Sequence, residues 1–151
     1  MTDKEIILQF LTTVKDEIKS RIKSTTNKTS DSLEVVMLGE THGQLLAADY
    51  IMALEHGRAP TRSGASSGSP TLRERIYAWA KINGIGSSEK ELTSLSWAIS
   101  KSIHTKGTLL YRTGGHSGII FKSFNESRIS DLLKTFAGKY QAIFETKVQF
   151  K

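Results

Sequence analysis

The residue types in this chain that could do chemistry are its histidines, its serines and its acidic pairs. The four histidines are His42, His56, His104 and His116. No two of them have the i,i+4 spacing with which a helix presents two ligands to one zinc ion, and no carboxylate signature accompanies them. Cysteine, which supplies zinc ligands and thiolate nucleophiles, is absent. The sequence therefore predicts no metal site and no cofactor.

One serine lies in a glycine-rich stretch, Gly115-His116-Ser117-Gly118. The order differs from the Gly-x-Ser-x-Gly turn that exposes a nucleophile between a strand and a helix, and no clear strand precedes it. A hydrolase built on Ser117 and His116 is one hypothesis, and it requires that Ser117→Ala abolish activity.

The acidic pairs and the glycine motifs give no stronger sign of catalysis. Glu34 with Glu40, and Glu89 with Glu91, lie where solvated or capping carboxylates usually occur. Two catalytic carboxylates also need a cleft that shifts their pKa values apart. Neither a phosphate-binding loop nor a dinucleotide fingerprint is present. We therefore expect a protein that is not an enzyme and has no catalytic residues.

Length and composition are those of one globular domain. The chain has 151 residues, of which 38% are hydrophobic and 24% charged, and a chain of this length buries a substantial core. We therefore expect a single domain over residues 1–151. No apolar run approaches the roughly 20 residues that cross a bilayer, and the first residues lack the features of a signal peptide. We expect no membrane contact and a chain made and used in a cytoplasm.

The net charge of +6 permits binding to nucleic acid or to an acidic protein surface without requiring it. The excess is spread between the first helix and the surroundings of a loop at residues 58–70. We favour the interpretation that most of these charges are solvated and keep a basic domain soluble.

Residues 4–24 are predicted to form a helix, because Thr2 and Glu5 have capping-box spacing and an apolar stripe follows. The stripe recurs at steps of three and four residues and consists of Ile7, Leu11, Val14, Ile18 and Ile22. It either lies on a sheet or docks on a neighbouring subunit.

The fold class expected is α+β, a small antiparallel sheet packed against the N-terminal helix and two to three further helices. Residues 33–38 are β-branched and end at Gly39, which predicts a strand. Residues 44–55 are apolar on both parities and fit a strand or a short helix; we favour a strand, which forms a hairpin with the first. Alternating apolar residues from 140 to 150 predict a C-terminal strand that completes the sheet.

Two helices with start signals are predicted in the middle of the chain, over residues 72–82 and 89–106. Pro70 fits the first turn of the earlier helix. The capping-box pairs are Thr71 with Glu74 and Ser88 with Glu91. The residues expected on the buried faces are Leu72, Ile76, Trp79 and Ala80, then Leu92, Leu95, Ile99 and Ile103. Tryptophans such as Trp79 and Trp97 are more often core or interface anchors than platforms for bases.

A further helix is predicted from Asn125 or Ser127 through Phe136, where Gly138 ends it. Residues 119–121 before it are apolar and fit a short strand or a plug that docks the glycine-rich loop. The chain shows no internal repeat.

The loop of residues 58–70 is rich in serine and glycine and is expected to be mobile in the free protein. Its arginines, Arg58 and Arg62, supply donors for a carboxylate or phosphate partner.

Three motifs in a fixed order resemble those of neck or tail-completion (head–tail connector) proteins of tailed bacteriophages. The first is the Glu-x-Gly-Arg-x-Pro pattern at residues 55–60. The second is Trp79-Ala80 followed by Gly84-Ile85, and the third is Ala98-Ile99 through Gly107-Thr108. The match covers roughly residues 45–125. It departs from the family pattern at residues 63–69, a Ser/Gly run in place of a compact turn containing proline.

The resemblance implies a structural virion protein that forms a ring at the head–tail junction, as a neck, tail-completion or tail-terminator subunit without catalysis. The implied partners are copies of itself, the portal or connector and tail proteins of the virion, and possibly the passing DNA. The implied location is the virion, assembled in the cytoplasm of the bacterial host. The candidate subunit-interface residues are Arg58, Arg62, Trp79, Trp97, Arg112, Ile7, Leu11 and Ile18.

The alternative is a small basic nucleic-acid-binding or regulatory module. Its candidate contacts are Arg58, Arg62, Arg73 and Arg75. No helix-turn-helix spacing is evident, and the aromatic residues do not interleave with Lys and Arg. Rings or incorporation into particles favour the structural role, and monomeric tight DNA binding favours the alternative.

Overall fold

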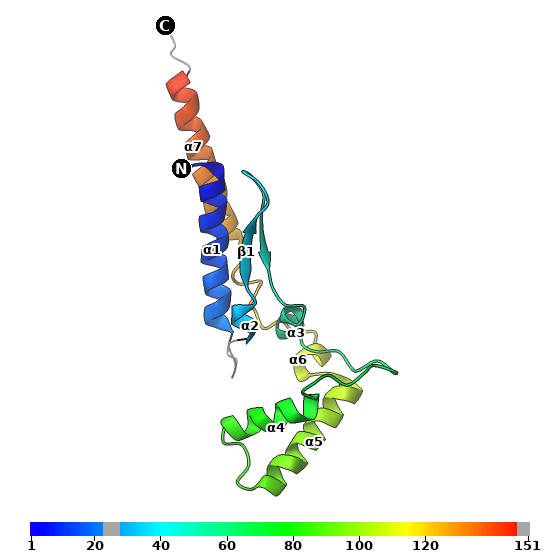
Figure 1. Cartoon of the computed structure of the whole chain (residues 1–151). Coiled ribbons are helices and arrows are strands. Elements are labelled where there is room, and N and C mark those ends of the chain that lie inside the picture. Colours follow the sequence, from blue (N-terminus) through cyan, green and yellow to red (C-terminus); the bar gives the residue numbers. More distant parts are fainter. Residues whose placement is uncertain (23–27, 148–151) are drawn as a thin grey trace. The chain divides into compact units, whose positions relative to one another are not determined.

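The computed structural model describes residues 1–22 and 28–147 (Figure 1). The chain divides into two compact units, where a single domain over residues 1–151 was expected. Residues 1–49 and 118–151 form the first unit, and residues 50–117 form the second. The second is therefore an insertion in the sequence of the first. The mixture of helices with a small antiparallel sheet confirms the α+β prediction.

The first unit is built on α1, Asp3–Arg21, whose capping box forms as predicted between Thr2 and Glu5. The helix lies on both strands of a hairpin, β1 (Glu34–Met37) and β2 (Gly43–Leu46). The strands are antiparallel and pair Glu34 with Leu46. The core residues that α1 supplies are Ile6, Leu11, Val14 and Ile18. Of the two interpretations of its stripe, the structure shows the helix on a sheet.

A glycine of β2, Gly43, lies directly against side chains of α1. A Cβ atom at Gly43 would lie 2.6 Å from Cδ1 of Leu11 and 2.9 Å from Cγ2 of Ile7. Real Cβ atoms do not approach that closely, so a side chain at Gly43 would require the side chains of Leu11 and Ile7 to shift. The short helix α2, Lys28–Asp31, precedes the hairpin, and Ser32 Oγ accepts a hydrogen bond of 3.2 Å from the Ala48 N–H at its far end.

The strand predicted over residues 44–55 is correct only up to Leu46. The chain leaves the sheet after Leu46 and forms α3, Ile51–His56. Ile51 and Glu55 are the buried residues of α3, and their i,i+4 spacing is helical. Residues apolar on both parities fit a short helix as well as a strand, so the pattern alone did not decide.

The predicted C-terminal strand is wrong over the described residues. The chain from Glu126 to Lys147 is one helix, α7, and it passes through Gly138 without a break. Asn125 caps it, because its Oδ1 accepts the Arg128 N–H at 2.9 Å. Residues 148–150 of the expected strand lie outside the described residues. Among residues 1–22 and 28–147, the sheet therefore has only the two strands of the hairpin.

The second unit contains a helical hairpin, α4 (Leu72–Ile82) and α5 (Glu89–Lys106), and the short α6 (Leu109–Arg112). The capping box of α4 forms as predicted, although Pro70 stands just before the cap residue Thr71. At the start of α5, the two halves of the predicted capping box involve two different serines. Ser88 Oγ accepts the Glu91 N–H at 3.3 Å, but the Glu91 carboxylate accepts from Ser87, at 2.8 Å from its N–H. These bonds hold the pKa of both Glu74 and Glu91 below the usual value, the backbone N–H groups of Thr71 and Ser87 contributing most.

The two helices pack through small residues. On α4, Ile76 and Ala80 are buried as predicted, whereas Trp79 is exposed. On α5, Leu92 is buried, but Leu95, Ile99 and Ile103 are only half-buried. The buried positions that follow Leu92 are Ser96 and Ser100, whose hydroxyls bond to their own helix at Thr93 O and Trp97 O. Short side chains whose hydroxyls bond to their own helix can be buried between two helices. A prediction of buried positions from apolar residues alone does not find them.

The start of the predicted mobile loop is anchored. Arg58 N–H donates to Thr108 Oγ1, and Thr108 N–H donates to the Arg58 carbonyl, both at 2.9 Å. Thr61 N–H donates to the His104 carbonyl at 2.9 Å, and Thr61 Oγ1 lies 2.6 Å from His104 Nδ1. Residues 62–70 beyond this point are all exposed. Residues 119–121, in the first unit, form turns and no strand.

Candidate functional site

A row of exposed apolar side chains in the first unit lies on α7. It is a stripe of five residues spaced four, three, four and three apart, which we call the α7 stripe: Ile129, Leu133, Phe136, Tyr140 and Ile143. Their exposed fractions are 43% for Ile129, 62% for Leu133, 52% for Tyr140 and 40% for Ile143, and Phe136 is half-buried. No residue of α7 is buried. A repeat averaging 3.5 residues is the pattern with which one helix packs along another.

A different side of α7 faces α1. Arg128 forms an ion pair with Glu17, which also accepts hydrogen bonds from Arg21. At the other end, Asp3 pairs with Lys139 and accepts a hydrogen bond of 2.6 Å from the Tyr140 hydroxyl. The two helices are thus antiparallel, and a groove of about 350 Å³ lined by Phe10 and Leu132 among others separates them.

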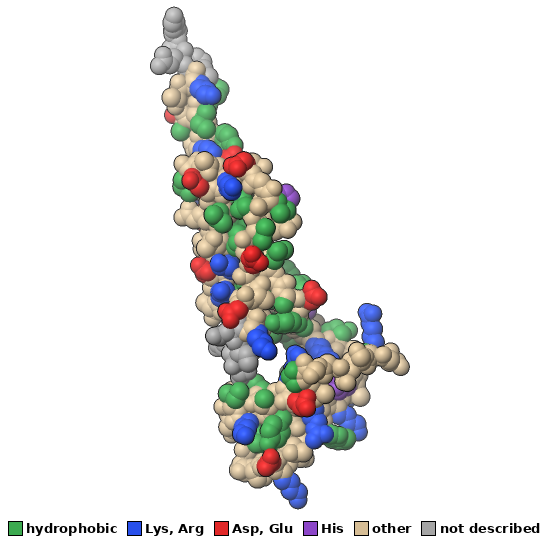
Figure 2. Space-filling view, viewed as in Figure 1, with side chains coloured by type: hydrophobic (Ala, Val, Ile, Leu, Met, Phe, Trp, Pro, Cys, Tyr) green, Lys and Arg blue, Asp and Glu red, His purple; other side chains and the backbone are tan. Residues whose placement is uncertain are grey.

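The last part of α7 runs past the start of α1. Lys139 and Tyr140 are already level with Asp3, the first residue of α1, so the following residues 141–147, about two turns of helix, have no α1 residue beside them (Figure 1). All of them are exposed, including Phe144 at 58%. Figure 2 shows hydrophobic side chains on the surface of this part of the molecule. Of the α7 stripe, Ile143 lies in this part, whereas Tyr140 bonds to Asp3 through its hydroxyl and leaves its ring half exposed.

The contacts of Asp3 make the α1–α7 pairing sensitive to acid. The hydrogen bonds from Lys139, first, and from Tyr140 lower the pKa of Asp3 from its usual 3.8. A lowered pKa means stability that is present above the pKa of the unfolded chain and lost as the pH falls through the folded value. Asp3→Asn should therefore have a lower urea midpoint than the natural protein at pH 7. The difference should vanish in strong acid.

The control for this prediction is Asp16→Asn, which removes an exposed carboxylate from the same helix. We expect its urea midpoint to stay parallel to that of the natural protein across the same pH range. A difference for Asp3→Asn that stayed constant down to strong acid would contradict an electrostatic role for Asp3.

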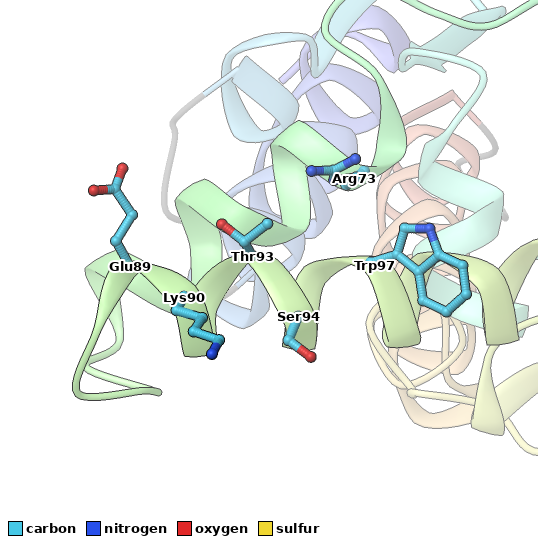
Figure 3. Close-up of a pocket in the computed structure, with 6 residues that line it drawn as sticks. All are labelled: Arg73, Glu89, Lys90, Thr93, Ser94 and Trp97. Atoms are coloured by element: carbon cyan, nitrogen blue, oxygen red, sulfur yellow. The ribbon is translucent and has the colours of Figure 1, made fainter.

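In the second unit, exposed aromatic and basic side chains share the outer surface of the helical hairpin. Trp79 is 43% and Trp97 53% exposed. A shallow hollow of about 650 Å³ is lined by Arg73 of α4 and by five residues of α5: Glu89, Lys90, Thr93, Ser94 and Trp97 (Figure 3). Lys101 Nζ lies 4.8 Å from the Trp97 ring centroid, a cation–π distance.

The polar cluster closest to a catalytic arrangement is also in the second unit. The Glu55 side chain is fully buried, and Ser117 Oγ donates to its Oε2 at 3.1 Å. His116 Nδ1 lies 3.1 Å from Nδ1 of His56, so one of the two nitrogens must carry the hydrogen. These bonds direct Ser117 to a carboxylate and the two histidines to each other, and they tie α3 to the chain before Gly118. The geometry fits a structural clamp.

Of the predicted interface residues, those on α1 are the least available. Leu11 and Ile18 are 8% and 1% exposed and belong to the core of the first unit, and Ile7 is half-buried beside Gly43. The structure corrects their use as docking residues, because the hairpin already covers them. In the second unit, Trp79, Trp97, Arg62, Arg73, Arg75 and Arg112 are exposed, and Arg58 is half-buried.

Sequence reasoning missed the α7 stripe because residues 140–150 were assigned to a strand. The signal was present. Tyr140 and Ile143 continue the three-and-four spacing that begins at Ile129. Ile143, apolar between Ala142 and Phe144, also interrupts the alternation that a strand over these residues would require. Among the described residues, no group of three or more His, Cys, Asp or Glu side chains is arranged to hold a metal ion. No described helix combines the length and the apolar character needed to cross a membrane.

Comparison of the chain with protein-family models, with curated proteins and with solved structures finds no match. The functional argument therefore depends on the surfaces described above.

Proposed function

We propose that this chain is a structural subunit of the head–tail junction of a tailed bacteriophage, where copies assemble into a ring through subunit–subunit contacts and catalyse no reaction. The observation that carries the proposal is the exposed α7 stripe. The ordered motifs at residues 55–60, 79–85 and 98–108 add the resemblance to neck and tail-completion proteins.

The α7 stripe is the kind of surface that assembly covers. A soluble monomer rarely exposes a continuous row of large apolar side chains, and such rows mark interaction sites. A ring requires a head-to-tail interface, in which two different patches of the same chain meet. The exposed Trp79 and Trp97 of the second unit are of the residue type that dominates interface energetics, and they supply a second patch.

The proposal assigns the ring to the virion, between portal or connector proteins and the tail, around the path of the DNA. Assembly takes place in the cytoplasm of the bacterial host. Arg58, Arg62 and Arg112 remain candidate contacts with the neighbouring subunit. Residues 62–70, exposed in the single chain, are the part of the loop that orders on assembly in this proposal, because their polar side chains bury little surface alone.

The test introduces one carboxylate into the α7 stripe and one beside it. Leu133→Glu places a charge at the most exposed position of the stripe, where burial against a partner would desolvate it. Lys134→Glu places the same side chain one residue along, roughly 100° around the helix. Light scattering after size exclusion should show rings for the natural protein and for Lys134→Glu, and monomers for Leu133→Glu with unchanged helix content.

A natural protein that stays monomeric at tens of micromolar and is missing from purified particles would refute the ring. Oligomers that survive in Leu133→Glu would move the interface away from the α7 stripe. A monomer that binds DNA tightly at physiological salt would favour the alternative, a small basic nucleic-acid-binding or regulatory module.

A further inference from the structure

The positive charge of this protein is concentrated in its second unit. Residues 50–117 contain nine Lys and Arg against four Asp and Glu, a net charge of +5 out of the +6 of the whole chain. The rest of the chain contains 12 basic and 11 acidic residues and is nearly neutral. The second unit is therefore strongly basic and the first nearly neutral. The linear sequence does not show this difference, because its basic residues are spread along the whole chain.

The cations of the second unit, all of them among the described residues, also form no ion pairs, although Arg73 is close enough to Glu74 to contribute to the lowered pKa of that carboxyl. The ion pairs of the structure, such as Arg128 with Glu17 and Lys139 with Asp3, all lie in the first unit. Within residues 50–117, all of which the structure describes, no Lys or Arg forms an ion pair. Three of the four acids there serve other purposes, since Glu74 and Glu91 cap helices and Glu55 is buried.

Part of this charge is ordered along one side of α5. Lys90, Ser94, Trp97 and Lys101 recur at i, i+4, i+7 and i+11 and so share a face; we call them the α5 basic stripe. Arg73 of α4 and Thr93 border it in the same hollow, together with one acid, Glu89 (Figure 3). Glu89 lies 3.4 Å from the Tyr77 hydroxyl. The stripe spans about 16 Å along the helix, and Figure 2 shows further Lys and Arg around the hairpin.

We infer that the second unit binds the phosphodiester backbone of DNA, independently of sequence, through a surface centred on the α5 basic stripe. Lys, Arg, Ser and Thr side chains are the groups that contact phosphate oxygens. An acidic protein partner would be held by an interface with an apolar centre, whereas Trp97 is the only large apolar side chain in this hollow. The inference does not depend on ring formation.

The test measures DNA binding of the full chain by fluorescence anisotropy, with two duplexes of unrelated sequence over a range of salt. The triple variant Arg73→Gln, Lys90→Gln, Lys101→Gln removes three charges from the surface. Its matched control, Lys28→Gln, Lys122→Gln, Lys147→Gln, removes three exposed charges from the first unit. Both variants have the same net charge.

We expect the natural protein to bind both duplexes alike, and the α5 triple variant to lose at least tenfold in affinity. Each lost phosphate contact should also reduce the slope of log K against log salt by about 0.9. The control triple should lose less than about threefold and keep its slope. Equal losses in the two triples, or no binding by the natural protein at about 100 mM salt, would overturn the inference.

Two further measurements distinguish DNA from an acidic protein as the partner, and DNA binding from ring formation. In the first, the protein is tested for binding to polyglutamate. If its affinity for polyglutamate equals that for DNA and is lost in the α5 triple variant, the partner is an acidic protein and the DNA assignment is refuted. Light scattering on the same samples reports the oligomeric state. A ring without DNA binding contradicts only this inference, and a monomer that binds DNA through the α5 basic stripe contradicts only the proposed ring.

Discussion

Gly57→Ala should destabilise the second unit by about 3 kcal/mol or more, whereas Gly64→Ala should cost only about 1 kcal/mol. Both glycines have a positive φ, +81° at Gly57 and +79° at Gly64. They differ in their surroundings. A Cβ at Gly57 would lie 2.4 Å from the Tyr111 backbone nitrogen and 2.5 Å from Thr108 Oγ1, but a Cβ at Gly64 would meet nothing within 4 Å.

The site at Gly57 has little freedom to relax. Thr108 Oγ1 accepts the Arg58 N–H and caps α6 by accepting the Tyr111 N–H, so two backbone segments are fixed on the same hydroxyl. Gly57 also has ψ near 168°, which with its positive φ is a region that glycine alone populates without strain. A methyl group must therefore break the connection between residues 57–58 and 108–111.

Thermal unfolding followed by circular dichroism measures the two variants, and limited trypsin digestion reports opening at Arg58 and Arg62. The Gly64 variant controls for the cost of a positive φ alone. Equal losses of stability in the two variants would mean that the chain at Gly57 is free to move, contrary to the anchored loop described above.

Ile18→Ala should lower the free energy of unfolding of the first unit by about 2–5 kcal/mol. Ile18 is 1% exposed and is among the largest fully buried side chains. It lies on the helix that covers the hairpin, so its truncation leaves a cavity in the core of this unit. A two-stranded hairpin is marginal alone, and loosening α1 should also loosen β1 and β2.

The control is Leu8→Ala on the same helix, where the side chain is 41% exposed and the expected change is within about 0.5 kcal/mol. Urea unfolding of both variants, monitored by circular dichroism, gives the comparison. If the two substitutions cost the same, the assignment of the α1 stripe to the core is wrong.

Helices with local start signals could be predicted from the sequence, and those that depend on distant contacts could not. The capping boxes at Thr2 and Thr71 located the starts of α1 and α4 because both halves of each box lie within four residues. The continuation of α7 past Gly138 has a local signal in the three-and-four spacing of Tyr140 and Ile143, but a glycine at this point usually indicates a helix end. A glycine inside a helix costs about 1 kcal/mol relative to alanine, and here the following residues, Lys139 and Tyr140, contact Asp3 at the far end of the sequence.

The candidate surfaces also depended on contacts between residues that are distant in the sequence. Trp79 was predicted both on the buried face of its helix and as an interface residue, and it is exposed; an aromatic residue on an amphipathic helix fits a core or an interface equally well. The burial of Leu11 and Ile18 depends on the packing of α1 against the hairpin, a long-range contact that the apolar stripe alone does not specify. The charge difference between the units is invisible without the boundaries at residues 50 and 117, and those depend on long-range contacts rather than on composition.

The bonds between Ser117 and Glu55 have a mechanical consequence. Ser117 N–H donates to the Glu55 carbonyl at 2.9 Å, and its hydroxyl donates to the carboxylate of the same residue. These two hydrogen bonds therefore join the beginning and the end of the inserted segment to each other. A force applied at residues 50 and 117 would therefore act on these two hydrogen bonds before it reaches the helical hairpin of α4 and α5.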